Sequence, residues 1–514
     1  MPSDAPTITR RPSGSKDHSS VPQEPQSPYA SHRKIHPKAV RGRFRRLKSG
    51  LGAVLLALFA LLPFLRWDRG PGVPDQAVLF DLGSQRFYIF AVQLWPQHVY
   101  YITGVMIIAA IGLFLATALG GRVWCGFTCP QTVWTDLFVW IERRVEGDRT
   151  DRIRLDKQPW TARWLAKKAV KHAAWLAISA VTGFLSIAYL TDAPTLAVDL
   201  LRFDASALAA GSVLFMAACT YLMAGFMREQ MCFYVCPWPR IQAAMLDEDS
   251  LVVTYQDWRG EGRAPLRKSE GWDTRNRMGF GDCIDCGQCV QVCPTGIDIR
   301  DGIQMECIGC GLCVDACNDV MARIGRPGDL IRFDTLTAQA AKAAAITETA
   351  KAAITTETAK ATAVPPPRYR LLRPRTIVYG LMLVVVGGAM AIALALKPSN
   401  DIAVLRDRAP LFVALSDGRI QNAYTIKIAN MSLTDRQYRL TLSGPPQASL
   451  GLSGESGEAG ELALSARANA VETYRIQVRV PRSALAGAST PLAFTLTPEP
   501  AGEPVRHDSV FLAP

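Results

Sequence analysis

The sequence predicts a multi-domain fold that combines an α-helical membrane bundle, an inserted α+β module and a C-terminal β-sandwich. Three observations predict it: long apolar runs, two cysteine runs in tandem before the last apolar run, and apolar–polar alternation in the final part of the chain. The chain has 514 residues. That length exceeds the roughly 100–200 residues of a typical domain and requires more than one domain.

The apolar runs predict about five transmembrane helices. They are Leu51–Leu65, Val99–Leu119, Ala173–Leu190, Ala205–Met227 and Ile377–Leu396. Each approaches or exceeds the roughly 18–20 apolar residues that cross a bilayer, although the first is short and contains Pro63. A cleaved signal peptide is the alternative for that first run, but the region before it is too long and shows no small-residue cleavage site. We therefore expect an uncleaved signal anchor.

Basic residues flank the apolar runs. The formal net charge is +12, concentrated in the stretch His32 to Lys48, the loop 120–171 and the segment Arg368–Arg375. Such placement favours membrane orientation over nucleic-acid binding, and no nucleic-acid partner is expected. The positive-inside rule places the N-terminus, loop 120–171 and segment 228–375 in the cytoplasm and residues 398–514 on the far side.

Composition divides the chain into six parts. We expect a disordered basic cytoplasmic tail at 1–47, four transmembrane helices at 48–260, a cysteine-rich module at 261–335, a low-complexity linker at 336–375, the fifth helix at 376–397 and a β-domain at 398–514. The tail is rich in Ser, Pro and charge, and the linker contains a near-repeat, Ile-Thr-Glu-Thr-Ala-Lys from Ile346 and Ile-Thr-Thr-Glu-Thr-Ala-Lys from Ile354, so neither pattern predicts a packed core.

The β-domain prediction rests on a period of two. Apolar residues alternate with polar ones at Tyr424, Ile426 and Ile428, at Tyr438, Leu440 and Leu442, along Tyr474–Val480, and at Leu492, Phe494 and Leu496. Together with Gly, Pro and Ser breaks, this pattern predicts half-buried strands, and the length suits a β-sandwich.

The 13 cysteines indicate metal ligation and not a secreted disulfide framework, since all but Cys219 fall in tight groups. Two runs, Cys283-x2-Cys286-x2-Cys289-x3-Cys293 and Cys307-x2-Cys310-x2-Cys313-x3-Cys317, match the bacterial ferredoxin pattern for two [4Fe–4S] clusters. The fourth cysteine of each run ligates the other cluster. Cluster 1 is therefore expected on Cys283, Cys286, Cys289 and Cys317, and cluster 2 on Cys293, Cys307, Cys310 and Cys313. Zinc, the alternative, usually takes two separated CxxC pairs.

Two CxxxCP motifs follow the second and fourth apolar runs. They are Cys125-Gly-Phe-Thr-Cys129-Pro130 and Cys232-Phe-Tyr-Val-Cys236-Pro237. Their parallel placement puts four sulfurs at one depth on the cytoplasmic face. Proline disfavours helical geometry at the preceding cysteine and starts a new short helix, whose N-terminus favours thiolate. Such a thiolate set suits Cu(I), zinc or an iron–sulfur cluster; redox disulfides or inert cysteines are the alternatives. Cys219, alone within a span, is expected to serve packing.

These motifs resemble the cytochrome c oxidase accessory protein family CcoG, also called FixG or RdxA, whose members are membrane polyferredoxins. The segments that carry the resemblance begin at Val123 (Val-Trp-Cys-Gly-Phe-Thr-Cys-Pro-Gln-Thr-Val-Trp), Cys232 (Cys-Phe-Tyr-Val-Cys-Pro), Cys293 (Cys-Pro-Thr-Gly-Ile-Asp-Ile-Arg-Asp-Gly-Ile-Gln) and Glu306 (Glu-Cys-Ile-Gly-Cys). The resemblance runs from about residue 75 to the C-terminus. It implies that the β-sandwich is immunoglobulin-like and periplasmic, in a protein of the bacterial inner membrane.

The resemblance also implies an activity. The family is implicated in assembling the cbb-type cytochrome c oxidase, and its proposed activity is reduction of Cu(II) to Cu(I) on the cytoplasmic side. By resemblance, Cys125, Cys129, Cys232 and Cys236 form the copper site and the two clusters form the electron relay. A copper chaperone or exporter and oxidase assembly factors are the partners that it implies.

Two other functions stay open. A quinol-linked electron-transfer subunit of the periplasmic nitrate reductase type shares both kinds of motif, but is not expected to carry the large β-domain. A pure assembly scaffold would not need eight intact ligand positions. Intramembrane haem is not expected, because only His98 and His172 lie near span ends, on opposite predicted faces. No dinucleotide fingerprint follows a strand, so the electron donor is unknown, and a homodimer that shares a cysteine site is possible.

Overall fold

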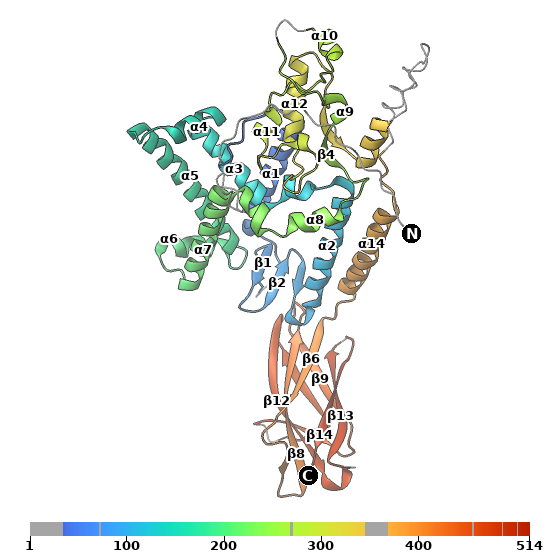
Figure 1. Ribbon diagram of the computed structural model, residues 1–514. Coiled ribbons are helices and arrows are strands. Elements are labelled where there is room, and N and C mark those ends of the chain that lie inside the picture. The colour runs from blue at the N-terminus through green and yellow to red at the C-terminus, as the bar shows by residue number, and fades with distance from the viewer. Residues whose placement is uncertain are drawn as a thin grey trace, which may run out of the picture.

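The computed structural model describes residues 34–70, 73–267, 271–344, 369–454, 457–485, 487–500 and 502–514. The predicted tail up to residue 33 and the low-complexity linker from 345 to 368 lie outside these residues. The fold has three parts stacked along one axis: a cysteine-rich module at one end, a helical bundle in the middle and a β-sandwich at the other end (Figure 1). This architecture confirms the predicted multi-domain fold class.

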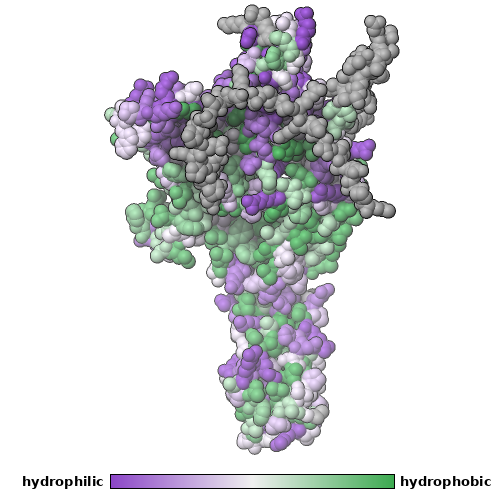
Figure 2. Space-filling model, in the orientation of Figure 1, coloured by the Kyte–Doolittle hydropathy of each residue, from purple (hydrophilic) through white to green (hydrophobic). Residues whose placement is uncertain are grey.

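Five helical segments among the described residues are long and apolar enough to cross a membrane. They are Arg43–Phe64, Pro96–Gly120, Ala162–Ile187, Ala207–Met227 and Pro374–Ala395, built on helices α1 (Arg43–Leu61), α2 (Tyr100–Gly120), α5 (Ala162–Ile187), α7 (Ala207–Leu222) and α14 (Pro374–Ala395). Hydrophobic residues gather over these helices in the middle of the molecule (Figure 2). The chain is therefore a multi-pass membrane protein.

Small residues let the helices pack closely in pairs. Helix α5 packs along α7, and α2 along α14. A methyl group added at Gly183 would lie 2.4 Å from the carbonyl oxygen of Val213, so only glycine permits this approach. Close backbone contact through small residues is the usual basis of helix association in a membrane.

A short sheet, absent from the predictions, lies between the bundle and the β-sandwich. Its antiparallel strands are β1 (Val78–Asp81), β2 (Arg86–Ile89) and β3 (Val92–Leu94). The Arg86 guanidinium donates to the Asn469 carbonyl over 3.0 Å and lies 3.9 Å from the centre of the Trp95 ring. The β-sandwich is thereby attached to the bundle by more than the chain connection after α14.

The cysteine-rich module is an α+β unit. Strands β4 (Val252–Tyr255) and β5 (Ile331–Asp334) pair antiparallel and enclose the helices α9 (Asp257–Gly260), α10 (Trp272–Arg277), α11 (Gln288–Val292) and α12 (Leu312–Arg323) in sequence. The predicted boundary at 261 is too late, because β4 belongs to this unit through its pairing with β5. A four-residue strand gives too short an alternation for detection from sequence.

The C-terminal part is a β-sandwich, as predicted. One sheet has the order β10–β12–β8–β6 with β7 paired to β8, and the other has β11–β9–β13–β14. The strands are β6 (Asn400–Arg406), β7 (Val413–Ala414), β8 (Arg419–Asn430), β9 (Arg436–Ser443), β10 (Ser449–Leu452), β11 (Glu461–Ala466), β12 (Ala470–Pro481), β13 (Ser489–Glu499) and β14 (Val505–Leu512). The alternating residues Ile426, Leu440, Ile476 and Phe494 meet in its core.

The beginning of the described chain corrects the predicted tail at 1–47. Helix α1 already starts at Arg43, and residues 34–42, named here the N-terminal strap, run without helix or strand across the cysteine-rich end of the bundle. The strap donates hydrogen bonds to both the bundle and the module, and it accepts hydrogen bonds from the bundle. Charge and low hydrophobicity predicted disorder here, but these polar residues bind to other polar residues far along the chain.

Candidate redox site

Both CxxxCP motifs fold in the same way. Each first cysteine lies in a wide π-helical turn, Trp124–Thr128 or Met231–Val235, and each second cysteine is extended. A new helix follows the proline in each case: α3 (Pro130–Val145) and α8 (Trp238–Met245). The backbone N–H of the second cysteine donates to the carbonyl oxygen of the first residue of the turn: Cys129 to Trp124 over 2.9 Å, and Cys236 to Met231 over 2.8 Å. The sequence prediction of a helix restarted by proline is confirmed at both motifs.

The two motifs lie side by side. The Gln131 side chain, two residues after the first motif's second cysteine, donates to the carbonyl oxygens of Met223 and Arg228, just before the second motif. On the other side of the second motif, the Arg122 guanidinium donates to the Pro239 carbonyl over 3.1 Å. The first motif is therefore bonded to both flanks of the second.

The thiols of the CxxxCP quartet (Cys125, Cys129, Cys232 and Cys236) are close enough to influence one another. Burial raises the pKa of the Cys125 thiol to about 12; the three other thiols act in the same direction and Arg122 opposes them. Burial likewise raises the pKa of Cys232 to about 11, reinforced by Cys129 and Cys236. The two motifs thus contribute to one thiol site, in which Cys125 is buried and the other three thiols have intermediate exposure.

One further side chain contacts this site. The Cys125 sulfur lies 2.9 Å from the amide oxygen of Gln242 on α8, and Gln242 is fully buried. The other end of that amide lies 3.3 Å from the Thr117 hydroxyl on α2. Sequence reasoning missed Gln242, because a lone glutamine in a short helix carries no motif. The Cys125 thiol donates to this buried amide oxygen, which orients the sulfur.

The ferredoxin cysteines form two groups. Burial raises the pKa of Cys317 to about 12, and the next causes are Cys289, Cys283 and Cys286. Burial also raises the pKa of Cys313 well above its ordinary value, reinforced by Cys310, Cys307 and Cys293 ahead of Cys289. We name Cys283, Cys286, Cys289 and Cys317 the first ferredoxin quartet, and Cys293, Cys307, Cys310 and Cys313 the second.

These thiols fit iron–sulfur ligation. All are free thiols, and Cys286 is the exposed one of the first ferredoxin quartet. Within the described residues, no three His, Cys, Asp or Glu side chains converge closely enough to hold a single metal ion. The four-thiol composition of each quartet and the ferredoxin spacing of its cysteines in the sequence agree with [4Fe–4S] ligation.

The second ferredoxin quartet packs directly on the first CxxxCP motif. Cys125 and Cys310 belong to one buried apolar group together with Ile308. A methyl group added at Gly126 would lie 2.8 Å from the Ile308 carbonyl oxygen and 3.1 Å from the Cys310 amide nitrogen. Arg122 donates to the Cys307 carbonyl over 3.0 Å. Backbone of the two thiol sites is therefore in contact, with no intervening layer of side chains.

Replacing Gly126 by alanine should separate these two sites. The added methyl group would lie closer than van der Waals distance to backbone atoms of Ile308 and Cys310. Backbone atoms, unlike the end of a flexible side chain, cannot move aside easily. We expect slower electron delivery to the CxxxCP quartet with iron content unchanged, measured by stopped-flow oxidation of the reduced clusters. Gly112 on α2 has open space around it, so Gly112→Ala is the matched control. Equal rates for the two variants would contradict the prediction.

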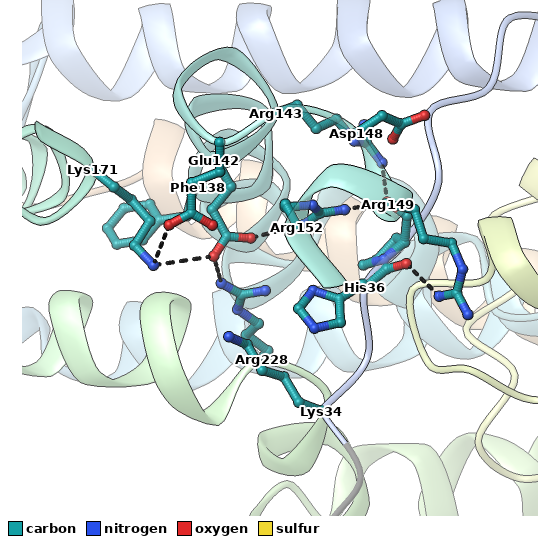
Figure 3. Close-up of polar contacts among 12 residues, drawn as sticks. Lys34, His36, Phe138, Glu142, Arg143, Asp148, Arg149, Arg152, Lys171 and Arg228 are labelled. Carbon is teal, nitrogen blue, oxygen red and sulfur yellow. Dashed lines mark hydrogen bonds and ion pairs between the residues drawn. The ribbon is translucent and has the colours of Figure 1, made fainter. Parts of the chain in front are cut away.

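A buried charge network joins the two motifs behind the thiols (Figure 3). Glu142 of α3 is 2 % exposed. One of its carboxylate oxygens accepts from Arg228, four residues before Cys232, over 2.7 Å. The other accepts from Arg152 of α4 (Arg149–Lys157) over 2.9 Å. The basic residues that predicted orientation from sequence are thus also structural partners of one carboxylate.

The N-terminal strap extends this network to the ferredoxin module. Arg152 donates to the Pro37 carbonyl over 2.6 Å, and Arg149 donates to the His36 carbonyl over 2.7 Å (Figure 3). One residue further, the Lys38 backbone N–H donates to the carbonyl of Gln291, on α11 within the first cysteine run, over 2.8 Å. The strap therefore bonds to the bundle on one side and to a cluster-bearing helix on the other.

Asp315 attaches the module to the first membrane helix. It lies on α12 between two cluster cysteines, yet its carboxylate points away from them and accepts from the backbone N–H groups of Phe44 and Arg45 over 3.2 and 2.8 Å. These are the first turns of α1, whose own N-cap, Gly42, supplies no side-chain oxygen. The ferredoxin module thus caps the first membrane helix.

Comparison with known proteins agrees with this division of the chain. Family models match residues 227–336 as a 4Fe–4S dicluster domain, residues 102–146 as a 4Fe–4S binding domain, and residues 390–514 as the immunoglobulin-like fold at the C-terminus of FixG. The chain is 45 % identical over 482 residues to Protein RdxA of Cereibacter sphaeroides, covering 93 % of this chain and 96 % of RdxA. It is 43 % identical over 498 residues to the nitrogen fixation protein FixG of Rhizobium meliloti, covering 93 % and 92 %.

Proposed function

The chain belongs to the FixG and RdxA family of iron–sulfur electron-transfer proteins, and we propose that it reduces Cu(II) to Cu(I) at the CxxxCP quartet. One observation carries the proposal: the first CxxxCP motif lies in backbone contact with the Cys310 loop of the second ferredoxin quartet. A reduced [4Fe–4S] cluster supplies one electron at a time, which matches the one electron that converts Cu(II) to Cu(I).

The residues of the site suit this reaction. Soft thiolates favour Cu(I) over Cu(II), so the quartet stabilises the product of the reduction. Arg122 fixes the relative position of the two thiol sites, because it donates both to the Cys307 carbonyl and to Pro239 beside the second motif. Exposed Cys286 marks the first ferredoxin quartet as the place where a donor protein can deliver electrons.

The proposal includes a side of the membrane. The end of the bundle with the clusters carries Arg45, Arg143, Arg149 and Arg152, and the positive-inside rule assigns such an end to the cytoplasm. The β-sandwich, at the opposite end, would then lie in the periplasm (Figure 1). A copper exporter or chaperone that accepts Cu(I) is the corresponding partner, in support of cbb-type oxidase assembly.

Serine variants of each cysteine pair test the proposal. In anaerobic protein reduced with dithionite and freed of excess reductant, we expect Cys125→Ser/Cys129→Ser and Cys232→Ser/Cys236→Ser each to lose Cu(II) reduction, measured with a Cu(I)-specific chelator. Cys219→Ser, a cysteine of intermediate exposure outside the quartet, should retain it. Unchanged copper reduction in the paired variants would refute the copper proposal. Reduction of a quinone analogue but not of Cu(II) would favour the quinol-linked function.

A further inference from the structure

We infer that the CxxxCP quartet holds a third [4Fe–4S] cluster, ligated jointly by both motifs. The inference rests on the proposed function and deepens it, since copper then meets this site as a substrate and not as the resident metal. The cysteine count motivates it. The match described as a 4Fe–4S binding domain spans residues 102–146 and includes Cys125 and Cys129, half of the four thiolates that a cubane takes.

The other two cysteines needed for a cubane, Cys232 and Cys236, lie in the region matched as a dicluster domain. The dicluster match, residues 227–336, contains the eight cysteines of the two ferredoxin quartets and also Cys232 and Cys236. Two clusters use the eight, so one pair is left over in each matched region. The structure brings these two pairs together: Gln131 and Arg122 bond the first motif to both flanks of the second.

The CxxxCP quartet resembles the two ferredoxin quartets, because each is a set of four free thiols. A [4Fe–4S] cubane takes four thiolates, one at each iron. In each of the three quartets, neighbouring thiols raise one another's pKa. The third site therefore has the same character as the other two.

The charges around the quartet suit an anionic cluster. Four thiolates give a cubane a net negative charge, and this cluster needs buried cations nearby. A cavity with Cys232 in its wall is lined by Arg45, Lys48, Arg143 and Arg228 against the carboxylates Asp136 and Glu229. Lys48 is 4 % exposed, and its nearest carboxylate oxygen, on Asp136, is 3.8 Å away. These positive charges, of which Lys48 and Arg228 are buried, favour an anionic cluster at the quartet.

Gln242 offers a test of the same assignment. It is fully buried, and its amide oxygen accepts from the Cys125 thiol over 2.9 Å. A metal-bound sulfur carries no proton, so with a cluster bound the amide would turn its N–H toward the sulfur, as hydrogen bonds to ligating sulfur commonly do in iron–sulfur proteins. Hydrogen atoms and the two ends of an amide are assigned from such contacts. The Gln242 amide is in place to set the potential of this cluster.

Iron analysis of the full chain tests the inference. Anaerobically purified protein should contain about twelve iron atoms and about twelve acid-labile sulfides per chain, and about eight of each if the quartet holds no cluster. Cys125→Ser/Cys129→Ser and Cys232→Ser/Cys236→Ser should each lose a third of the iron and one set of cluster signals by Mössbauer and EPR spectroscopy. Cys219→Ser should lose none. In Gln242→Leu, the same cluster's potential should shift while the other two stay unchanged.

The outcomes separate this inference from the proposed function. About eight iron atoms per wild-type chain, with or without stoichiometric copper, overturns the third cluster and leaves copper reduction to be judged by its own assay. If the paired serine variants lose a third of the iron and the wild-type protein does not reduce Cu(II), the third cluster is supported and the copper reaction is refuted. If a paired variant fails to fold, the wild-type count and the Gln242→Leu potential still decide.

Discussion

Glutamine in place of Glu142 should detach the two CxxxCP motifs from each other. The Glu142 carboxylate lies between Arg228 and Arg152, over 2.7 and 2.9 Å, in surroundings that leave it 2 % exposed. Glutamine keeps the shape but removes the charge, so two buried guanidinium groups lose their shared counter-ion. Breaking a buried ion pair from one side costs about 3–5 kcal/mol, which is a large share of a typical folding free energy. We expect a lower thermal midpoint and loss of copper reduction, with the ferredoxin EPR signals retained.

Glu146 provides the matched control for this change. It lies one helical turn after Glu142, directly after the end of α3, and is equally buried, but its ion pairs are with Lys168 and Lys171, over 3.0 and 3.1 Å, and not with Arg228. Glu146→Gln should therefore destabilise the bundle without separating the motifs. A Glu142→Gln protein that reduces copper at the wild-type rate, or a Glu146→Gln protein that fails equally, would contradict this role of Glu142.

The same carboxylate predicts a pH dependence with a definite sign. Burial alone would raise the pKa of Glu142, but the charges of Arg228, Arg152 and Lys171 outweigh it and hold the pKa below the ordinary 4.5. A carboxylate with a lowered pKa in the folded state contributes stability at pH above its unfolded value. That contribution is lost as the pH falls through the lowered folded value. Glu142→Gln should lack this acid-sensitive part of the stability in melts between neutral and acidic pH.

The membrane helices were predictable because each is a long apolar run. Val99–Leu119 and Ala205–Met227 were expected where the spans Pro96–Gly120 and Ala207–Met227 are found. The third helix was placed too late, at Ala173, because its first turns contain basic residues that an apolar window rejects. Lys168 and Lys171 remain helical there because they pair with carboxylates of α3 and α4. Such pairing depends on the tertiary fold and leaves no periodicity in the sequence.

The cysteine motifs predicted which residues gather, but not how the thiol sites are arranged relative to one another. Spacing alone identified the ferredoxin and CxxxCP residues, since a cluster needs thiolates at fixed intervals. The contact of Gly126 with the Cys310 loop joins segments far apart in the chain and has no local pattern. The contacts of the strap and of Glu142 were likewise not predictable, because the sequence shows their charged residues without showing which distant residues they bind.

Alanine at Asp315 should uncouple the ferredoxin module from the membrane helices while its clusters stay intact. The carboxylate accepts from the first N–H groups of α1, which face an end with no capping side chain of its own. Losing a helix cap costs about 0.5–2 kcal/mol, and here that energy is part of the docking of one domain on another. We expect wild-type iron content and a slower transfer of electrons from the reduced clusters to Cu(II).

Two further variants make this prediction specific to docking. Asp315→Asn retains an oxygen that can accept one of the two backbone N–H groups and should restore most of the rate. Asp319→Ala alters the next turn of α12, where the aspartate is exposed and forms an ion pair with the exposed Arg323, so this change should have little effect on the rate. If alanine at 319 slows transfer as much as alanine at 315, the effect belongs to the helix and not to the cap. A slower rate at 315 alone, with asparagine close to wild type, requires the Asp315 carboxylate to hold the second ferredoxin quartet against the CxxxCP motif.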